Sequence, residues 1–360
     1  TGGGTGGHVF PGLALAEYLI EQEAYECLWI GSGKAIEHSI VKRWDMPFYS
    51  IPAGKLRRYF SLRTLIDAFR VLAGFFASLV LLRRLSPDLL FSKGGYVSVP
   101  PVYAARVLGI PVITHDSDYD PGLATRLNAR VADRVCVPYQ QSLDFFPGLK
   151  PGSLVVTGNP VRKEVYLGDA GRWYAKSGMQ QDKPLLFVQG GSQGAEELND
   201  FVLDSLPQLL EFCCVVHQTG EHGYQRCLER LQSDTALQGR YFPQAFFTKE
   251  YPDILAAAIC SVCRAGAGTL WELAAVQLPA VVIPLHGGSR GDQLRNAKLF
   301  AGMGMVDVQA DRDWPACVAQ VFRIMQNEAQ QLAMKQALAG LNARQAVERL
   351  AQECKEMLCS

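Results

Sequence analysis

The chain has 360 residues, and its 35 Lys plus Arg balance 35 Asp plus Glu, so the formal net charge at pH 7 is zero. That balance argues against a protein whose main task is to grip a nucleic-acid backbone. A hydrophobic fraction of 48% excludes intrinsic disorder, and the length suits two domains. No secretory signal is recognisable, and no apolar run approaches the roughly 20 residues of a membrane-spanning helix.

Ten cysteines are spread along the chain, unlike the dense disulfide frameworks of small secreted proteins. Cys260 and Cys263 form an isolated CxxC inside an apolar run that is typical of a buried strand. We interpret them as packing thiols rather than as a metal or redox pair, and we expect a reducing compartment.

The sequence opens on a glycine-rich segment, Thr1–His8, which precedes a helical pattern over Pro11–Ile20. A turn of this kind normally follows a β-strand. We therefore expect this chain to be a fragment that lacks the first strand of its fold; the alternative is a genuine N-terminal loop.

Short apolar strands then alternate with amphipathic helices, the pattern of parallel α/β sheets. The first half predicts strands at Cys27–Ile30, Asp88–Phe91, Pro111–Thr114, Arg134–Val137 and Leu154–Val156. It predicts helices near Lys34–Trp44, Leu62–Leu85, Val99–Leu108 and Gly122–Val131. After a linker with a short helix at 158–183, the second half predicts strands at Pro184–Val188, Cys213–His217, Ile259–Cys263 and Ala280–Pro284, and a helical tail at Glu328–Leu358. Two doubly wound domains that face each other across a cleft are expected.

The first glycine loop matches G-x-G-x-x-G at Gly2, Gly4 and Gly7. No acidic residue closes the next strand to hold a ribose, so a dinucleotide site is excluded, and no Walker loop is present. Because His8 stands at the entry to a helix, we interpret the loop as functional rather than as a simple tight turn. Arg162, near the domain junction, could bind a diphosphate or be a surface arginine.

Three further loops in the second half follow predicted strands. Gly190–Gly194, with Ser192, suits phosphate binding through backbone N–H groups and the helix dipole, although it could also be a packing turn. Glu272 falls in about the first turn of a helix, where it could hold a ribose diol or simply be favoured by the dipole. Asp292 and Gln293 enter another helix, where they could bind sugar hydroxyls or cap the helix.

Together and in this order, the loops resemble the MurG family of bacterial peptidoglycan glycosyltransferases (glycosyltransferase family 28). The resemblance covers nearly the whole chain and rests on Gly3–Gly12, Gly94–Ser98, Gly109–Val112, Gly158–Arg162 and Gly190–Ala195. It implies an α/β GT-B fold of two Rossmann-like domains. Residues 1–162 would bind acceptor and membrane, residues 163–339 would bind UDP-N-acetylglucosamine (UDP-GlcNAc), and a last helix at about 340–360 would pack back on the first domain.

The resemblance implies an inverting transfer of N-acetylglucosamine to the 4-hydroxyl of the N-acetylmuramoyl group of lipid I, giving lipid II. His8 and Asp118 are the candidate bases. The implied substrate-binding residues are Thr5, Gly6, Gly7, Asp118, Arg162, Ser192, Phe247, Ala267, Gly268, Thr269, Leu270, Trp271, Glu272 and Gln293. No Asp-x-Asp motif occurs, so no metal site or cofactor is predicted, although divalent cations could stimulate transfer. The implied partners are the two substrates and other cell-wall synthesis proteins, on the cytoplasmic face of the cell membrane.

Two departures from the family pattern concern the sugar contacts. The family commonly reads His-Glu-Gln-Asn where this chain reads His115–Asp118, and it often has paired glutamines where Asp292 and Gln293 stand. The competing interpretations are another lipid-linked glycosyltransferase, such as a glycolipid synthase, and an inactive UDP-sugar-binding membrane module.

A basic and apolar segment, residues 55–84, predicts a membrane contact. Its apolar run Val71–Leu82 is too short to cross a bilayer. Arginines flank the run at positions 57, 58, 83 and 84, and aromatic residues lie along it, which suits an anionic membrane interface. The alternative is an ordinary buried helix.

Overall fold

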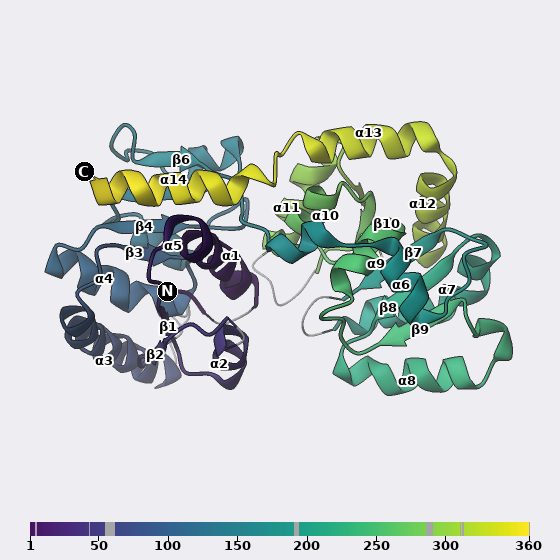
Figure 1. The fold of residues 1–360 in the computed structure, drawn as a ribbon, viewed down its shortest axis with the longest axis horizontal. Coiled ribbons are helices and arrows are strands. Elements are labelled where there is room, and N and C mark those ends of the chain that lie inside the picture. The colour runs from purple at the N-terminus through teal and green to yellow at the C-terminus, as the bar shows by residue number, and fades with distance from the viewer. Residues whose placement is uncertain are drawn as a thin grey trace. The chain divides into compact units, whose positions relative to one another are not determined.

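The computed structural model describes residues 1–3, 6–42, 44–54, 62–190, 194–285, 291–309, 311 and 313–359, without the side chains of residues 6, 35, 36 and 62–65. The chain divides into two compact units (Figure 1), one of residues Thr1–Arg162 with Ala343–Ser360 and one of residues Lys163–Asn342. Each unit consists of parallel strands and helices.

In the first unit, all paired strands are parallel and form two sheets, β1-β2 and β3-β4-β5-β6. Every strand is short, as expected where helices alternate with strands. The strands are β1 (Trp29–Gly31), β2 (Phe48–Ser50), β3 (Leu90–Ser92), β4 (Val112–His115), β5 (Arg134–Val137) and β6 (Leu154–Val156). The helices are α1 (Gly6–Glu23), α2 (Ala35–Lys42), α3 (Leu62–Leu85), α4 (Val99–Leu108), α5 (Leu123–Asn128) and α14 (Gln345–Cys359), with 3₁₀ turns at Tyr96–Ser98 and Gln140–Phe145.

Residue 1 bridges the two sheets of the first unit. Its amino group donates to the carbonyl of Phe91 in β3 at 2.7 Å, and its carbonyl accepts from the N–H of Lys93 at 2.8 Å. Its hydroxyl donates to the carbonyl of Ile30 in β1 at 2.9 Å. Thr1 therefore pairs with β3 as a residue of a parallel strand does, while it also contacts β1.

The C-terminal tail, which the sequence predicts to be helical over Glu328–Leu358, forms two helices. The chain turns at Asn342, whose φ of 50° is left-handed, after α13 (Glu328–Ala339) of the second unit. In the first unit, α14 packs beside α1 (Figure 1) through Leu15, Leu19 and Leu350. The tail thus contributes one helix to each unit.

The second unit has one six-stranded parallel sheet in the order β12-β11-β10-β7-β8-β9, the doubly wound order of a Rossmann-like domain. Its strands are β7 (Leu185–Gln189), β8 (Cys214–Gln218), β9 (Tyr241–Gln244), β10 (Ala258–Cys263), β11 (Ala280–Val282) and β12 (Asp307–Val308). Its other helices are α6 (Ala170–Ser177), α7 (Glu196–Phe212), α8 (Glu221–Gln232), α9 (Tyr251–Ala257), α10 (Ala267–Val276), α11 (Asp292–Gly302) and α12 (Trp314–Gln326), with 3₁₀ turns at Lys163–Leu167 and Thr235–Leu237.

The core of the second unit explains its cysteines. Strands β7, β8 and β10 pack against α7 and α12 through fully buried side chains such as Val188, Phe201 and Val321. Cys260 and Cys263 are buried in β10, and burial raises the pKa of the Cys263 thiol to about 12. Both thiols therefore stay protonated near neutral pH and act as small apolar groups, as the sequence predicts.

Candidate functional site

His8 lies in the first turn of α1, which begins five residues before the expected start at Pro11. The two glycine loops of the first unit meet there. Gly95 has a φ of 75°, and a Cβ at this position would lie 2.6 Å from the carbonyl oxygen of Gly3 and 3.4 Å from Cδ2 of His8. Gly95 therefore permits a close approach that sets the place of the His8 ring.

The structure describes some, but not all, of the predicted binding residues around His8. Gly6 and Gly7 open α1, whereas Thr5 lies outside the described residues. The Arg162 guanidinium stacks on the ring of Phe10, with 4.7 Å between its central carbon and the ring centroid. The structure therefore brings Arg162 to the first turns of α1, within the same unit as His8.

The loop after β4 carries Asp118 and is held by a buried carboxylate. Asp116 accepts from the N–H groups of Asp118 and Gly122, each at 3.0 Å. His115 is buried beside it, and its Nε2 lies 2.8 Å from the carbonyl oxygen of Gly158. Burial holds the pKa of His115 well below its usual value, so this imidazole is neutral and positions the loop.

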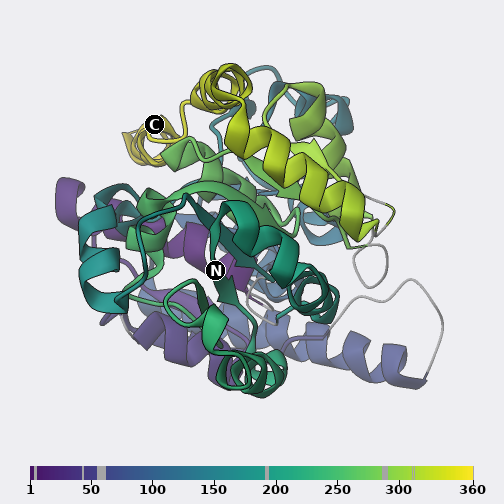
Figure 2. The ribbon, with the colours of Figure 1, turned by 90° about the vertical axis from the view of Figure 1, so that its right-hand side faces the viewer.

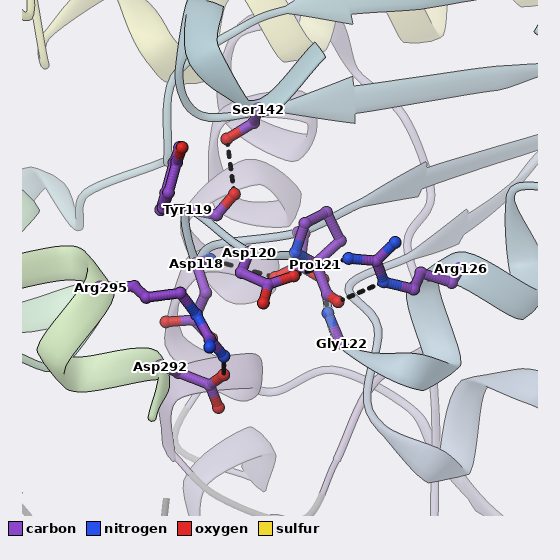
Figure 3. Close-up of polar contacts among 10 residues, drawn as sticks. Asp118, Tyr119, Asp120, Pro121, Gly122, Arg126, Ser142, Asp292 and Arg295 are labelled. Atoms are coloured by element: carbon purple, nitrogen blue, oxygen red, sulfur yellow. Dashed lines mark hydrogen bonds and ion pairs between the residues drawn. The ribbon is translucent and has the colours of Figure 1, made fainter. Parts of the chain in front are cut away.

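The outer part of the same loop is fixed by two further contacts (Figure 3). The carboxylate of Asp120 pairs with Arg126 at 2.6 Å, and the Ser142 hydroxyl donates to the carbonyl of Tyr119 at 2.8 Å. Asp118 is half-buried between these anchors. A loop held at both ends can present the Asp118 side chain in a fixed position.

Lys93 is a buried cation beneath this loop, and sequence reasoning gave it no role. Its Nζ donates to the Ser117 hydroxyl at 2.5 Å, and that hydroxyl donates to Oδ1 of Asn159 at 2.7 Å. Burial lowers the pKa of Lys93 to about 8, although the nearby charges of Asp116 and Asp118 oppose the shift. The lysine links β3, the Asp118 loop and the segment that leads to Arg162.

This buried lysine predicts a pH-dependent stability. Below pH 8, Lys93 is protonated in both the folded and the unfolded chain, so the folded state carries the cost of a buried charge. Between pH 8 and its ordinary pKa of 10.5, only the unfolded chain binds the proton, so stability rises with pH. We expect the stability difference between wild type and Lys93→Met to change by roughly 3 kcal/mol between pH 7.5 and 10.

Urea unfolding of the first unit, followed by hydrogen exchange of peptides from β3–β5, measures that difference. Lys150→Met, at an exposed position, is the matched control, and its stability difference from wild type should be the same at both pH values. An equal stability difference for Lys93→Met at pH 7.5 and pH 10 would contradict the lowered pKa of Lys93.

In the second unit, the turn between β7 and α7 requires glycine. Gly194 has a φ of 72°, and a Cβ there would lie 2.7 Å from the carbonyl oxygen of Thr219. A Cβ at Gly190 would lie 2.5 Å from the backbone nitrogen of Ala195. Glycine at these two positions therefore permits close backbone approaches just before the N-terminus of α7, a position that attracts anions. Ser192 lies outside the described residues.

Phe247 belongs to an aromatic cluster that the sequence did not reveal. Its ring is only 7% exposed and packs edge-on against Trp173 and Phe187, with centroids 5.9 and 6.1 Å apart. Its backbone N–H donates to Oε1 of Gln218 at 3.3 Å. Most of the ring is therefore committed to packing, and its contact with uracil stays a prediction.

Helix α10 contains the predicted set Ala267–Glu272. Leu270 and Trp271 are buried, whereas Gly268 and Thr269 are half-buried at the start of the helix. The expectation that Glu272 falls in about the first turn is wrong, because the helix begins at Ala267 and Glu272 lies in the second turn. The helix dipole acts mainly on the first turn, so it explains this carboxylate poorly. Instead, Oε2 of Glu272 accepts from the Tyr251 hydroxyl at 2.8 Å.

Helix α11 begins at Asp292, where the sequence places polar residues entering a helix. Asp292 pairs with Arg295 one turn along the helix at 3.0 Å (Figure 3). Oε1 of Gln293 accepts from the N–H of Leu285 at 3.0 Å. Gln293 thus fastens the end of the preceding segment to α11, and its contact with sugar stays a prediction.

The described part of the chain lacks two features. No group of three or more His, Cys, Asp or Glu side chains in these residues could hold a metal ion. Within the same residues, no helix combines the length and apolar character that a bilayer crossing demands.

Comparisons with known proteins agree with this arrangement. Family models described as the glycosyltransferase family 28 N-terminal and C-terminal domains match residues 1–137 and 185–351. A Treponema denticola protein named UDP-N-acetylglucosamine--N-acetylmuramyl-(pentapeptide) pyrophosphoryl-undecaprenol N-acetylglucosamine transferase is 44% identical over 87% of this chain and 83% of its own. A Bacillus cereus protein of the same name, numbered 2, is 36% identical over 99% and 98%.

Among solved structures, that of Acinetobacter baumannii MurG superposes with a TM-score of 0.72 at 27% identity, covering 98% of this chain and 97% of that one. The resemblance drawn from the loops and the GT-B fold of two Rossmann-like domains are thereby confirmed. The chain belongs to glycosyltransferase family 28.

Proposed function

We propose that this chain transfers N-acetylglucosamine from UDP-GlcNAc to the 4-hydroxyl of the N-acetylmuramoyl group of lipid I, giving lipid II. The observation that carries the proposal is the match to relatives of that named activity over nearly the entire chain. The fixed Asp118 loop and the glycine turn before α7 add the polar groups that such a transfer needs.

The reaction is a direct displacement at the anomeric carbon of the donor. The acceptor oxygen forms the new bond to that carbon while the bond to the UDP oxygen breaks, and UDP leaves with the electron pair. His8 takes the proton of the acceptor hydroxyl, with Asp118 as the competing base. In this scheme the Gly190–Gly194 turn, Ser192 and Arg162 stabilise the leaving diphosphate, and Glu272 binds the ribose.

Acceptor choice tests the proposal. We expect the intact chain to transfer labelled GlcNAc to a short-chain, water-soluble lipid I analogue and to leave diacylglycerol unchanged. A glycolipid synthase would show the reverse preference. Absence of transfer to either acceptor, with UDP binding retained, would favour an inactive UDP-sugar-binding module instead.

We also propose a peripheral contact with the cytoplasmic face of the membrane, and part of α3 supports a membrane contact (Figure 2, lower right). Phe75, Leu79 and Leu82 pack into the core of the first unit, as the buried-helix alternative requires. A neighbouring face of α3 carries large apolar side chains that are more than half exposed, namely Ile66, Phe69, Leu72, Phe76 and Val80. Arg83 and Arg84 end the helix, whereas Arg57 and Arg58 lie outside the described residues. An apolar stripe beside cations suits an anionic interface.

Removing that stripe should release the protein from vesicles. We expect Phe69→Ser with Phe76→Ser to reduce cosedimentation with anionic vesicles at least about tenfold, because two exposed rings lose their burial in the lipid interface. Transfer to the water-soluble acceptor should survive. Leu167→Ser with Leu332→Ser, at exposed apolar positions of the second unit, is the control. Unaltered vesicle binding by the Phe69 and Phe76 variant would refute the assignment.

A further inference from the structure

We propose that Tyr251 and Gln189 are positioning residues that hold the Glu272 carboxylate for the donor's ribose, so that they set the preference for a ribonucleotide. The inference rests on the proposed function, because it takes Glu272 as the ribose ligand. Both residues lie outside the set that the sequence singled out. They join three separate elements of the second unit, β7, α9 and α10.

The contacts form a chain of three side chains. The Tyr251 hydroxyl lies 2.8 Å from Oε2 of Glu272 and 3.1 Å from the side-chain oxygen of Gln189. A tyrosine hydroxyl carries one proton, so it cannot donate to both acceptors. The carboxylate is the stronger acceptor, so Tyr251 donates to Glu272.

The amide of Gln189 completes the chain when its nitrogen faces Tyr251. The oxygen and nitrogen of an amide are assigned from their hydrogen bonds, and either orientation fits the same shape. With the amide oxygen toward Tyr251, Nε2 of Gln189 is buried and has no hydrogen-bond partner among the described residues, which is costly. Turning the amide gives Nε2 an acceptor in the Tyr251 oxygen. The hydrogen bonds then run in one direction, from Gln189 through Tyr251 to Glu272.

Both donors are held rigidly. Gln189 is 3% exposed and ends β7, where its backbone pairs with Cys263 of β10 and Gln218 of β8. Tyr251 is 7% exposed, opens α9 and packs its ring edge-on against Phe187, with centroids 5.9 Å apart. The carboxylate of Glu272 therefore rests against a hydroxyl that is itself fixed by packing.

This arrangement lowers the cost of donor binding. A glutamate side chain loses rotamer freedom when it is immobilised. Tyr251 imposes part of that loss before the ligand arrives, so the ribose hydroxyls meet a preorganised acceptor. A ligand that lacks the bonded hydroxyl gains little from the same preorganisation, so the benefit is specific to the ribose diol.

Titration calorimetry on the intact chain with UDP, 2′-deoxy-UDP and 3′-deoxy-UDP tests the proposal. We expect Tyr251→Phe to raise the Kd for UDP about five- to tenfold, because the Glu272 side chain then loses part of its rotamer freedom only when UDP binds. The Kd of at least one deoxy analogue should change less than about twofold. Gln189→Met should also weaken the binding of UDP more than that of the deoxy analogue, but to a smaller extent than Tyr251→Phe. Tyr224→Phe on α8 is the matched control.

A readout in transfer separates positioning from general damage. Tyr251→Phe should raise KM for UDP-GlcNAc and leave kcat at saturating donor within about twofold. If Tyr251→Phe raised the Kd values of UDP and both deoxy analogues equally, or left the Kd for UDP unchanged, the proposal would be overturned. If Tyr251→Phe changes the preference for UDP over its deoxy analogues but the wild type transfers nothing to lipid I, the proposed function is wrong and the positioning role stands. If the wild type transfers to lipid I but Tyr251→Phe leaves that preference unchanged, the positioning role is wrong and the proposed function stands.

Discussion

His8→Ala is expected to lower kcat for transfer by about 10² or more, the usual loss when a general base is removed. The reason is the place of His8 in the first turn of α1, where its ring lies against Gly95. UDP binding should change little, because the groups proposed to bind UDP lie mainly in the second unit. Single-turnover rates with saturating donor and acceptor measure the chemical step.

The competing base provides the control. Asp118→Asn introduces the residue that the family commonly carries there, and it should retain most of the turnover. Near-normal turnover in His8→Ala, together with a large loss in Asp118→Asn, would assign the proton transfer to Asp118. Gly95→Ala should also reduce turnover, because a Cβ there would press on the Gly3 backbone and touch the His8 ring.

Trp173→Ala is expected to destabilise the second unit by about 3–5 kcal/mol, the range for removing a buried aromatic side chain. Trp173 is 2% exposed, and its ring packs edge-on against Phe242 and Phe247 at centroid distances of 5.2 and 5.9 Å. Its loss would leave a cavity beside the Phe247 ring, so donor affinity should fall as well.

Urea unfolding followed by hydrogen exchange of β7–β10 peptides measures this loss, and UDP titration measures the change in affinity. Arg172→Ala, one residue earlier on α6, is the control, because its ion pair with Asp253 is exposed and should contribute far less. A loss below about 1 kcal/mol in Trp173→Ala would show that the cluster repacks around the gap.

Sequence patterns predicted most of the parallel strands well, because most of them contain a continuous apolar run. The bounds of β5 and β6 match the expectation residue for residue. Three strands were missed for local reasons. Strand β9 contains Pro243, which argues against a strand, but it lies at the sheet edge, where proline is tolerated. Strand β12 has only two residues, and β2 ends in an exposed serine, so neither forms an apolar run as β6 does.

The site was predicted less completely than the fold, because it depends on contacts between distant residues. Motifs identified the loops that carry His8 and Asp118. Nothing in the local sequence indicated that Lys93 would be buried against Ser117, or that Tyr251 would reach Glu272. Each of these pairs joins separate elements, so only the packed structure brings its members together.

The anomeric configuration of the product tests the central claim most directly. Intact chain, UDP-GlcNAc and a lipid I analogue are incubated together, and the product is analysed by mass spectrometry and NMR. The account predicts one added N-acetylhexosamine in β linkage to the 4-hydroxyl of the N-acetylmuramoyl group, with release of UDP. An α linkage, attachment at another hydroxyl, or release of free GlcNAc without a glycosylated lipid would contradict it.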